Sequence, residues 1–212
     1  MRLHRGGRFR AWLGRRLGGD AALGDRTWRR ILHVLAAGAL LYYLLPPRVL
    51  FGLPNEAIPL LALAAVAALE ALRLTGRLEV PVLRSYERGR PASYAYFGLA
   101  IVLSVLLFPE PIAVAVVLGT AIVDPIAGEV RGRGGALYPW VPFGTYAVLA
   151  FAALASLGGG TIPVAAGLAL LSAGIAIAVE APSWAYLDDD LAMTLVPGVV
   201  LTLLALAVPG LL

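Results

Sequence analysis

Seven apolar stretches separated by short loops take up most of this 212-residue chain. A helix needs about 20 apolar residues to cross a hydrocarbon core roughly 30 Å thick. With 60% hydrophobic and only 14% charged residues, the chain is excluded from the class of soluble domains. We therefore predict an all-α membrane protein, a polytopic bundle of about seven transmembrane helices, or six if residues 57–74 only re-enter the membrane. The predicted spans are residues 31–53, 57–74, 93–109, 111–128, 142–158, 161–180 and 191–211.

The chain divides into a basic amino-terminal segment, residues 1–28, and a transmembrane domain, residues 29–212. No apolar run in the first segment is long enough for a cleavable signal peptide. Its apolar residues recur at helical spacing between arginines, which predicts a short interfacial amphipathic helix on the membrane. A flexible basic tail fits this composition equally well. The residues that carry the helical spacing are Phe9, Trp12, Leu13 and Leu17.

The charges are distributed very unevenly between the two sides of the membrane. Of the 17 basic residues, all of which are arginine, only Arg48 would lie on the sparsely charged side. Glu56 and Glu110 are the only acidic residues there. Short cytoplasmic loops are enriched in arginine, so we expect a multi-pass protein whose amino terminus and active site are cytoplasmic. The carboxyl terminus would then be external.

Several functional classes lack their signatures. The chain has no cysteine, which excludes disulfides, thiolate metal sites and a cysteine nucleophile. Walker A, GxSxG and HExxH motifs are absent, and no inverted repeat supports a transporter. The formal charge of +4 comes mainly from the amino-terminal segment and suits anionic lipid head groups or phosphates. We expect no nucleic-acid partner, because the remainder of the chain is bilayer material.

Three consecutive carboxylates, Asp188, Asp189 and Asp190, stand directly before the last apolar stretch. Carboxylate oxygens bind Mg²⁺ together with substrate phosphates. Acidic residues are also stabilised at a helix amino terminus by the helix dipole, so capping of the last span is the alternative interpretation.

Asp124 lies inside a predicted span, about one turn from its cytoplasmic end. Ionisable residues in a span are costly and usually face a protein interior or a water-filled site. Pro125 removes a helical hydrogen bond, while Gly119 and Gly128 permit close backbone approach, so we predict a broken helix lining a polar pocket. Alternatively, Asp124 reaches the surface or pairs with an arginine.

His33 follows Arg30 at the start of the first predicted span, where the arginine fork suits a phosphate. A lone histidine at this depth is also compatible with an interfacial hydrogen bond. Four further residues on the same side, which would support the site or anchor loops as ion pairs, are Glu70, Arg73, Glu87 and Arg90.

Five strings on the predicted cytoplasmic side resemble, in order and spacing, the dolichol kinase and phytol kinase family of membrane-bound isoprenoid alcohol kinases. They are RRILH at 29–33, ERGRPASYAYFGLA at 87–100, GTAIVDPIAGEVRGRG at 119–134, FGT at 143–145 and VEAPSWAYLDDDLAMTLVPG at 179–198. The resemblance covers about residues 29–198. It implies transfer of a phosphoryl group, typically from CTP rather than ATP, to the hydroxyl of a long prenyl alcohol in the membrane, with Mg²⁺.

The resemblance, together with neighbouring charged residues, implies three groups of site residues. Asp190, Arg131 and Arg133 are included for their charge and place in the sequence and not because they match a family motif. Asp124 and His33 would accept or orient the alcohol proton. A metal ion would be held by Asp188, Asp189, Asp190 and Glu180. The nucleotide phosphates would be bound by Arg30, Gly128, Arg131, Arg133, Gly144 and Thr145.

Two departures from the family pattern stand out. Asp190 occupies a position where the family usually has asparagine, and the basic residue expected before FGT is missing, so Arg131 and Arg133 would have to contact the triphosphate. A CTP-dependent cytidylyltransferase that makes a CDP-activated lipid is the enzymatic alternative, and a non-enzymatic carrier or assembly protein is the other. The sequence sets neither the acceptor alcohol nor the oligomeric state.

Overall fold

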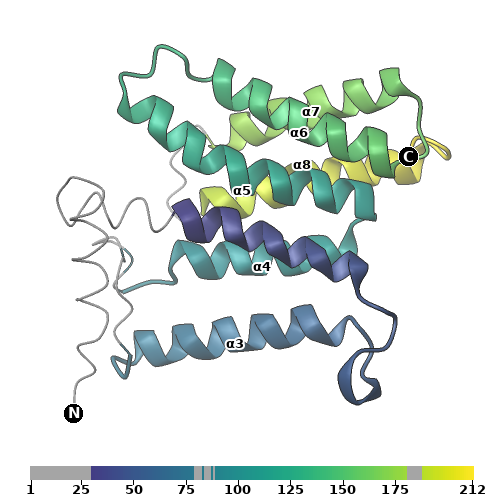
Figure 1. Cartoon of the computed structure of the whole chain (residues 1–212). Helices are drawn as coiled ribbons and strands as arrows, with labels where there is room; N and C mark the ends of the chain where they lie inside the picture. Colours follow the sequence, from purple (N-terminus) through teal and green to yellow (C-terminus); the bar gives the residue numbers. More distant parts are fainter. Residues whose placement is uncertain (1–29, 79–82, 84–86, 88, 181–187) are drawn as a thin grey trace.

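The computed structural model describes residues 30–78, 83, 87, 89–180 and 188–212, which form an antiparallel bundle of helices without a strand (Figure 1). The predicted all-α membrane bundle is confirmed, with seven helices in the described part of the chain. The predicted amino-terminal helix or tail lies outside these residues. We call Arg30–Leu44 the first helix; the others are α3 (Ala57–Leu74), α4 (Ser93–Leu107), α5 (Glu110–Gly132), α6 (Trp140–Leu157), α7 (Ile162–Glu180) and α8 (Asp189–Ala207).

Five of these helices, α3 and α5 to α8, are long and apolar enough to cross a membrane. The first helix and α4 are shorter apolar helices. Residues 57–74 form one continuous helix, α3, of 18 residues. The chain is therefore a membrane protein. Its two shortest helices contribute residues to the end of the bundle at which His33, Asp124 and Asp190 lie, which we call the charged end.

The first span is shorter than predicted. Instead of continuing to residue 53, the helix ends at Leu44, and its second half, η1 (Ala37–Leu44), is a 3₁₀ helix. Pro46 and Pro47 follow immediately and cannot supply the backbone N–H groups that a helix needs. The remaining residues form a loop with a 3₁₀ turn, η2 (Leu50–Gly52), in which Phe51 adopts a φ of 62°.

The prediction of a broken helix around Asp124 is wrong, because α5 continues through Pro125 to Gly132. The expected close backbone approach occurs at only one of the two glycines. A Cβ on Gly119 would lie 2.5 Å from the Tyr146 ring of α6, whereas nothing lies within 4 Å of that position on Gly128. Gly119 therefore permits the packing of α6 on α5, and Gly128 is exposed near the charged end.

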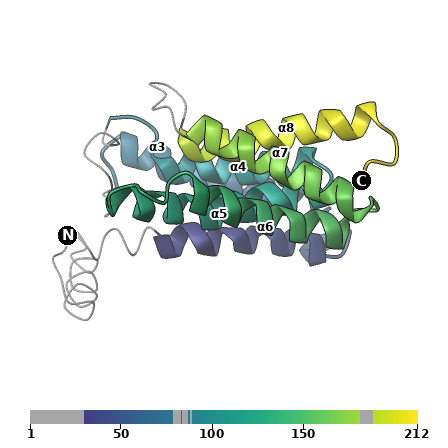
Figure 2. The same ribbon diagram turned by 90° about the horizontal axis from the view of Figure 1, so that it is seen from above.

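Burial differs strongly between the middle and the margin of the bundle. In the most apolar window of α5, 56% of the residues are buried, compared with 17% in α3. Figure 2, turned by 90°, shows α8 and the first helix on opposite sides of α5. The core is built from apolar residues of α4 to α8, with Tyr146, Ile112 and Leu154 among its largest buried side chains. The helix α5 is thus central to the bundle, and several other helices pack against it.

Candidate active site at the charged end of the bundle

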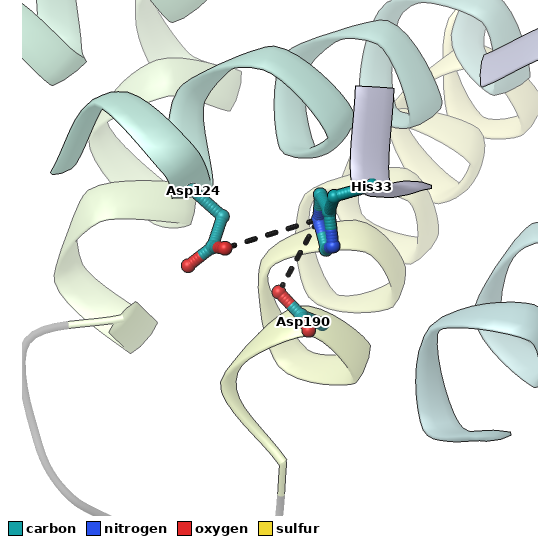
Figure 3. Close-up of side chains that lie close together, drawn as sticks. All are labelled: His33, Asp124 and Asp190. Carbon is teal, nitrogen blue, oxygen red and sulfur yellow. Dashed lines mark ion pairs between the residues drawn. The ribbon is translucent and has the colours of Figure 1, made fainter. Parts of the chain in front are cut away.

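Three ionisable side chains from three different helices converge at the end of the bundle where the first helix and α8 begin (Figure 3). His33 Nε2 of the first helix lies 3.5 Å from Asp190 Oδ1 of α8 and 3.9 Å from Asp124 Oδ2 of α5. We call this group the His33 cluster. Its members are 157 residues apart along the chain at most, so only the tertiary fold brings them together.

The acidic triplet both caps α8 and contributes to this cluster. Asp188 is the N-cap residue, and its side chain accepts a hydrogen bond from the Asp190 backbone N–H at 3.2 Å. This arrangement is the predicted capping role, in which a carboxylate satisfies an otherwise unpaired helix donor. One turn of the helix directs the three carboxylates differently, so that Asp190 is buried while Asp188 and Asp189 are half-buried. Capping and a role in the site are therefore compatible in one segment.

Ser93, the first residue of α4, is a site residue that the sequence analysis did not single out. Its hydroxyl donates to Asp190 Oδ2 at 2.6 Å and lies 3.3 Å from Asp188 Oδ1. The position of this serine, at the start of a helix on the charged side, could have identified it as a candidate site residue. Deeper in the bundle, Thr194 Oγ1 bonds to the Asp190 backbone carbonyl at 2.7 Å and to Thr120 Oγ1 at 3.0 Å. These hydroxyls hold the start of α8 against α4 and α5.

Asp190 Oδ1 differs from the other carboxylate oxygen of Asp190 in its hydrogen bonding. Asp190 is 4% exposed, and this oxygen has no hydrogen-bond partner among the described residues, although it faces His33 Nε2. Buried carboxylate oxygens normally have a donor or a cation nearby, because leaving one unpaired costs a large desolvation free energy. Asp190 Oδ1 is therefore a candidate ligand atom for a cation.

The donor set fits a hard divalent cation. Ligand atoms of His33, Asp124 and Asp190 all lie within 4.8 Å of one another, and the same is true of Asp188, Asp189 and Asp190. Carboxylate oxygens suit Mg²⁺, whereas imidazole is the more usual ligand of softer metals. The carboxylates of the second group would thus suit Mg²⁺, and His33 and Asp124 would be available for proton chemistry.

The orientation of His33 is fixed by stacking. Its ring lies parallel to that of Phe97 of α4, with centroids 4.1 Å apart and an interplanar angle of 5°. Because Phe97 is buried, the imidazole plane is held while its Nε2 edge points toward the two aspartates. Phe97, which orients a potential base, is the second site residue that was not predicted from the sequence.

The arginines predicted to bind phosphate are engaged in ion pairs with glutamates. Arg30 contacts Glu129 at 2.6 Å, and Arg133 donates to the same carboxylate at 2.8 Å. Glu129 was not among the predicted site residues. These pairs are partly or largely exposed, and exposed ion pairs contribute only about 0–1 kcal/mol. An incoming phosphate could therefore replace Glu129 as the partner of either arginine.

Glu180, predicted as a metal ligand, lies in a separate group at the end of α7. Its buried carboxylate pairs with Arg131 and accepts a hydrogen bond from the Tyr138 hydroxyl at 2.6 Å. The Arg131 guanidinium lies 5.3 Å from the centroid of the Tyr138 ring. Burial, followed by the hydrogen bond to Glu180, raises the pKa of Tyr138 to about 12. The structure thus gives Glu180 an arginine and a tyrosine as partners and keeps it apart from the acidic triplet.

Glu70 and Arg73 form a buried network near the end of α3. Arg73 donates to Glu70 at 2.7 Å and to the backbone carbonyls of Glu87 and Arg90 at 2.9 and 2.6 Å. Glu70 also accepts from the Ala92 N–H at 2.7 Å and from the Tyr94 hydroxyl. These bonds agree with the interpretation of the group as an anchor, since they fix the chain that leads into Ser93.

The remaining predicted phosphate-binding residues lie on helices. Gly144 and Thr145 belong to α6, where the Thr145 hydroxyl bonds to the Val141 carbonyl one turn earlier at 2.8 Å. Gly128 lies on α5 between Asp124 and Glu129. Of the predicted residues, the His33 cluster therefore gathers His33, Asp124 and Asp190, with Asp188 joined to it through Ser93.

No family model matches the sequence, and no match was found among curated proteins or solved structures. A function for the chain therefore rests on the geometry of its residues and on the five sequence strings described above.

Proposed function

We propose that this protein is a lipid kinase that transfers the γ-phosphoryl group of a nucleotide, with CTP as the preferred donor, to the hydroxyl of a long-chain isoprenoid alcohol at the cytoplasmic membrane face. The observation that carries this proposal is the convergence of His33, Asp124 and Asp190, in which Asp190 Oδ1 accepts no hydrogen bond from the described residues. The resemblance of five sequence strings to isoprenoid alcohol kinases supplies the reaction class.

The chemistry of phosphoryl transfer suits this inventory. The reaction depends mainly on positioning and on neutralising charge, and it requires little covalent chemistry from the protein. The alcohol oxygen forms a bond to the γ-phosphorus while the bond from phosphorus to the β,γ-bridging oxygen breaks, releasing the nucleoside diphosphate. The hydroxyl proton passes to His33 Nε2 or to Asp124, which lie 3.9 Å apart and can approach the same atom.

Mg²⁺ held by Asp188, Asp189 and Asp190 would neutralise charge on the phosphate oxygens. Ser93 and the Asp188 cap keep Asp190 in place, and Phe97 keeps the imidazole in plane. Arg30 and Arg133 would exchange Glu129 for phosphate oxygens. Each of these residues thus binds a substrate or metal ion, orients a neighbouring side chain or accepts a proton.

The test is transfer of label from γ-labelled CTP or ATP to lipid in the presence of Mg²⁺, using purified protein in nanodiscs and a panel of prenyl alcohols. We expect label in a prenyl phosphate, and we expect Asp124→Asn to reduce the rate by about 10²-fold or more. Glu110→Gln, which removes a carboxylate at the start of α5, is the matched control and should retain activity.

Two results would contradict the proposal. Release of pyrophosphate with no labelled prenyl phosphate would identify nucleotidyl transfer. No reaction of either nucleotide with folded protein would indicate a non-enzymatic role.

A further inference from the structure

An apolar groove opens on the side of the bundle, between the first helix, α3 and α4. It has a volume of about 450 Å³, within the range of small-molecule sites. Several of its wall residues are small, which is why neighbouring side chains leave it open; they are Ala36, Gly38, Ala39, Ala62 and Gly98. Leu35 and Leu41 on its rim are 65% and 63% exposed, so the groove faces the surroundings of the bundle.

The buried residues of α3 lie near its two ends, which leaves its middle more exposed beside the groove. These residues are Pro59 near the start and Glu70 and Arg73 near the end. The Glu70–Arg73 network ties that end to the segment before α4. Between these points, Leu60 and Leu61 are 52% and 57% exposed. The slot lies between this exposed middle and α4.

The groove begins one helical turn from residues of the His33 cluster. Residues three or four apart lie on the same face of a helix, so Ala36 follows His33 on the first helix, and Ile101 follows Phe97 on α4. Ala36 and Ile101 both line the groove, whereas His33 and Phe97 form the stacked pair beside Asp190. Along both helices, the backbone positions of the slot and of the stacked pair are therefore about one turn, roughly 5 Å, apart.

We propose that this groove binds the hydrocarbon tail of the lipid substrate, and that the substrate is a single-chain alcohol rather than a two-chain lipid such as diacylglycerol. This inference rests on the proposed function, whose site it extends. The wall along α4 runs from Gly98 to Val105, about 10 Å of helix, so the slot holds the head-proximal part of one chain while the rest of a long tail lies in the bilayer. The hydroxyl of such a chain reaches His33 as its first units enter the slot.

The probe is geranylgeraniol that carries a diazirine on one of its head-proximal isoprene units, photolysed with the full-length protein in phosphatidylcholine nanodiscs without nucleotide. Mass spectrometry then locates the cross-links. We expect them on residues that line the groove, and we expect unlabelled geranylgeraniol to compete with the probe while dioleoylglycerol does not.

Gly38→Leu is the decisive variant, because Gly38 lines the groove and nothing lies within 4 Å of a Cβ at this position. Gly167→Leu on α7 is the matched control, since Gly167 is also an exposed helical glycine with nothing within 4 Å. Extra volume in an apolar site changes binding by about tenfold or more, so Gly38→Leu should lower the cross-linking yield to that extent and Gly167→Leu should not. Ala62→Leu fills the slot from α3 and should act in the same direction as Gly38→Leu.

The cross-linking result and the kinase result can be separated. Cross-links in the groove without phosphoryl transfer would support the tail site and contradict the kinase. Phosphoryl transfer that is unaffected by Gly38→Leu and Ala62→Leu would support the kinase and overturn the tail site. Equal competition by dioleoylglycerol, or equal labelling of the outer face of α7, would also overturn it.

Discussion

Two buried groups of charged residues at the same end of the bundle are organised in opposite ways. In the Glu70–Arg73 network the charges are matched, and the guanidinium donates to one carboxylate and two backbone carbonyls. In the His33 cluster two carboxylates approach one imidazole, and Asp190 has no arginine partner among the described residues. The first group satisfies its own donors and acceptors, while the second leaves the Asp190 Oδ1 acceptor open.

The difference separates anchoring from chemistry. A buried ion pair that is fully hydrogen-bonded holds its elements in place, and breaking it leaves an uncompensated charge. A buried carboxylate without its own cation is costly, and perturbed groups of this kind cluster at functional sites. We therefore expect substitutions in the two groups to affect different quantities.

The largest effect is expected at Asp190. Asp190→Asn should lower the rate of phosphoryl transfer by about 10³-fold, the upper range for loss of one electrostatic contact to the reacting groups. It should not lower the melting temperature, because asparagine still accepts from Ser93 and removes a negative charge near Asp124. The rate of label transfer and the thermal unfolding of the same sample provide the comparison. Loss of stability with unchanged activity per folded molecule would assign Asp190 to anchoring instead.

Arg73 should show the reverse pattern. Arg73→Met leaves the buried Glu70 carboxylate without its cation and should lower the free energy of unfolding by about 3 kcal/mol. Activity per folded molecule should stay close to that of the wild type. Arg77→Met is the matched control, because Arg77 lies just beyond α3 and is exposed. Equal destabilisation by both variants would show that the network makes no specific contribution.

A third substitution tests the chemical role within the His33 cluster. His33→Gln should lower kcat by about 10²-fold, the lower range for general-base catalysis, with a small change in KM for nucleotide. Because a histidine base acts only when neutral, wild-type activity should fall as the pH is lowered, and this limb should disappear from the pH profile of the variant. Phe97→Leu, which removes the stacking partner but keeps the imidazole, should preserve the limb. An unchanged profile in His33→Gln would leave Asp124 as the proton acceptor.

The order of the helices could be predicted from the sequence, since apolar stretches of about 20 residues have few alternatives in a membrane. The predicted bounds 57–74 agree with α3, and 161–180 differs from α7 by one residue. The first span was predicted too long because Pro46 and Pro47 were included in it. Pro125 was given too much weight, since its neighbours in α5 hold the helix through it.

The site was predictable in part. Positive-inside counting and the acidic triplet placed His33, Asp124 and Asp190 on one side of the membrane, but their contact depends on how three helices rotate against one another. The ion-pair partners of the arginines were harder to predict. An arginine suits a phosphate and a glutamate equally, so the sequence did not indicate that Glu129 would engage Arg30 or that Glu180 would engage Arg131. Ser93 was overlooked because a serine at a helix start is common.

The smallest effect is expected at Tyr138. This residue belongs to a third group, in which Glu180 is paired with Arg131 and Tyr138, and it extends the comparison. Tyr138→Phe removes one hydrogen bond and should lower the free energy of unfolding by about 1 kcal/mol, with little change in activity. In a Glu180→Gln background the same substitution should cost less, which a double-mutant cycle measures.

The pH dependence of this contribution follows from the raised pKa of Tyr138, about 12 in the folded protein against an ordinary value of 10. The folded state favours the protonated hydroxyl, so the stabilisation is fully present below pH 10 and is lost as the pH rises toward 12. Unfolding measured for the wild type and Tyr138→Phe should therefore converge over that interval. A constant difference between the two proteins up to pH 12 would mean that the hydroxyl does not act through its proton on Glu180. The Glu180 group would then be held by Arg131 alone, and the contrast between matched and open clusters would rest on the Glu70–Arg73 network.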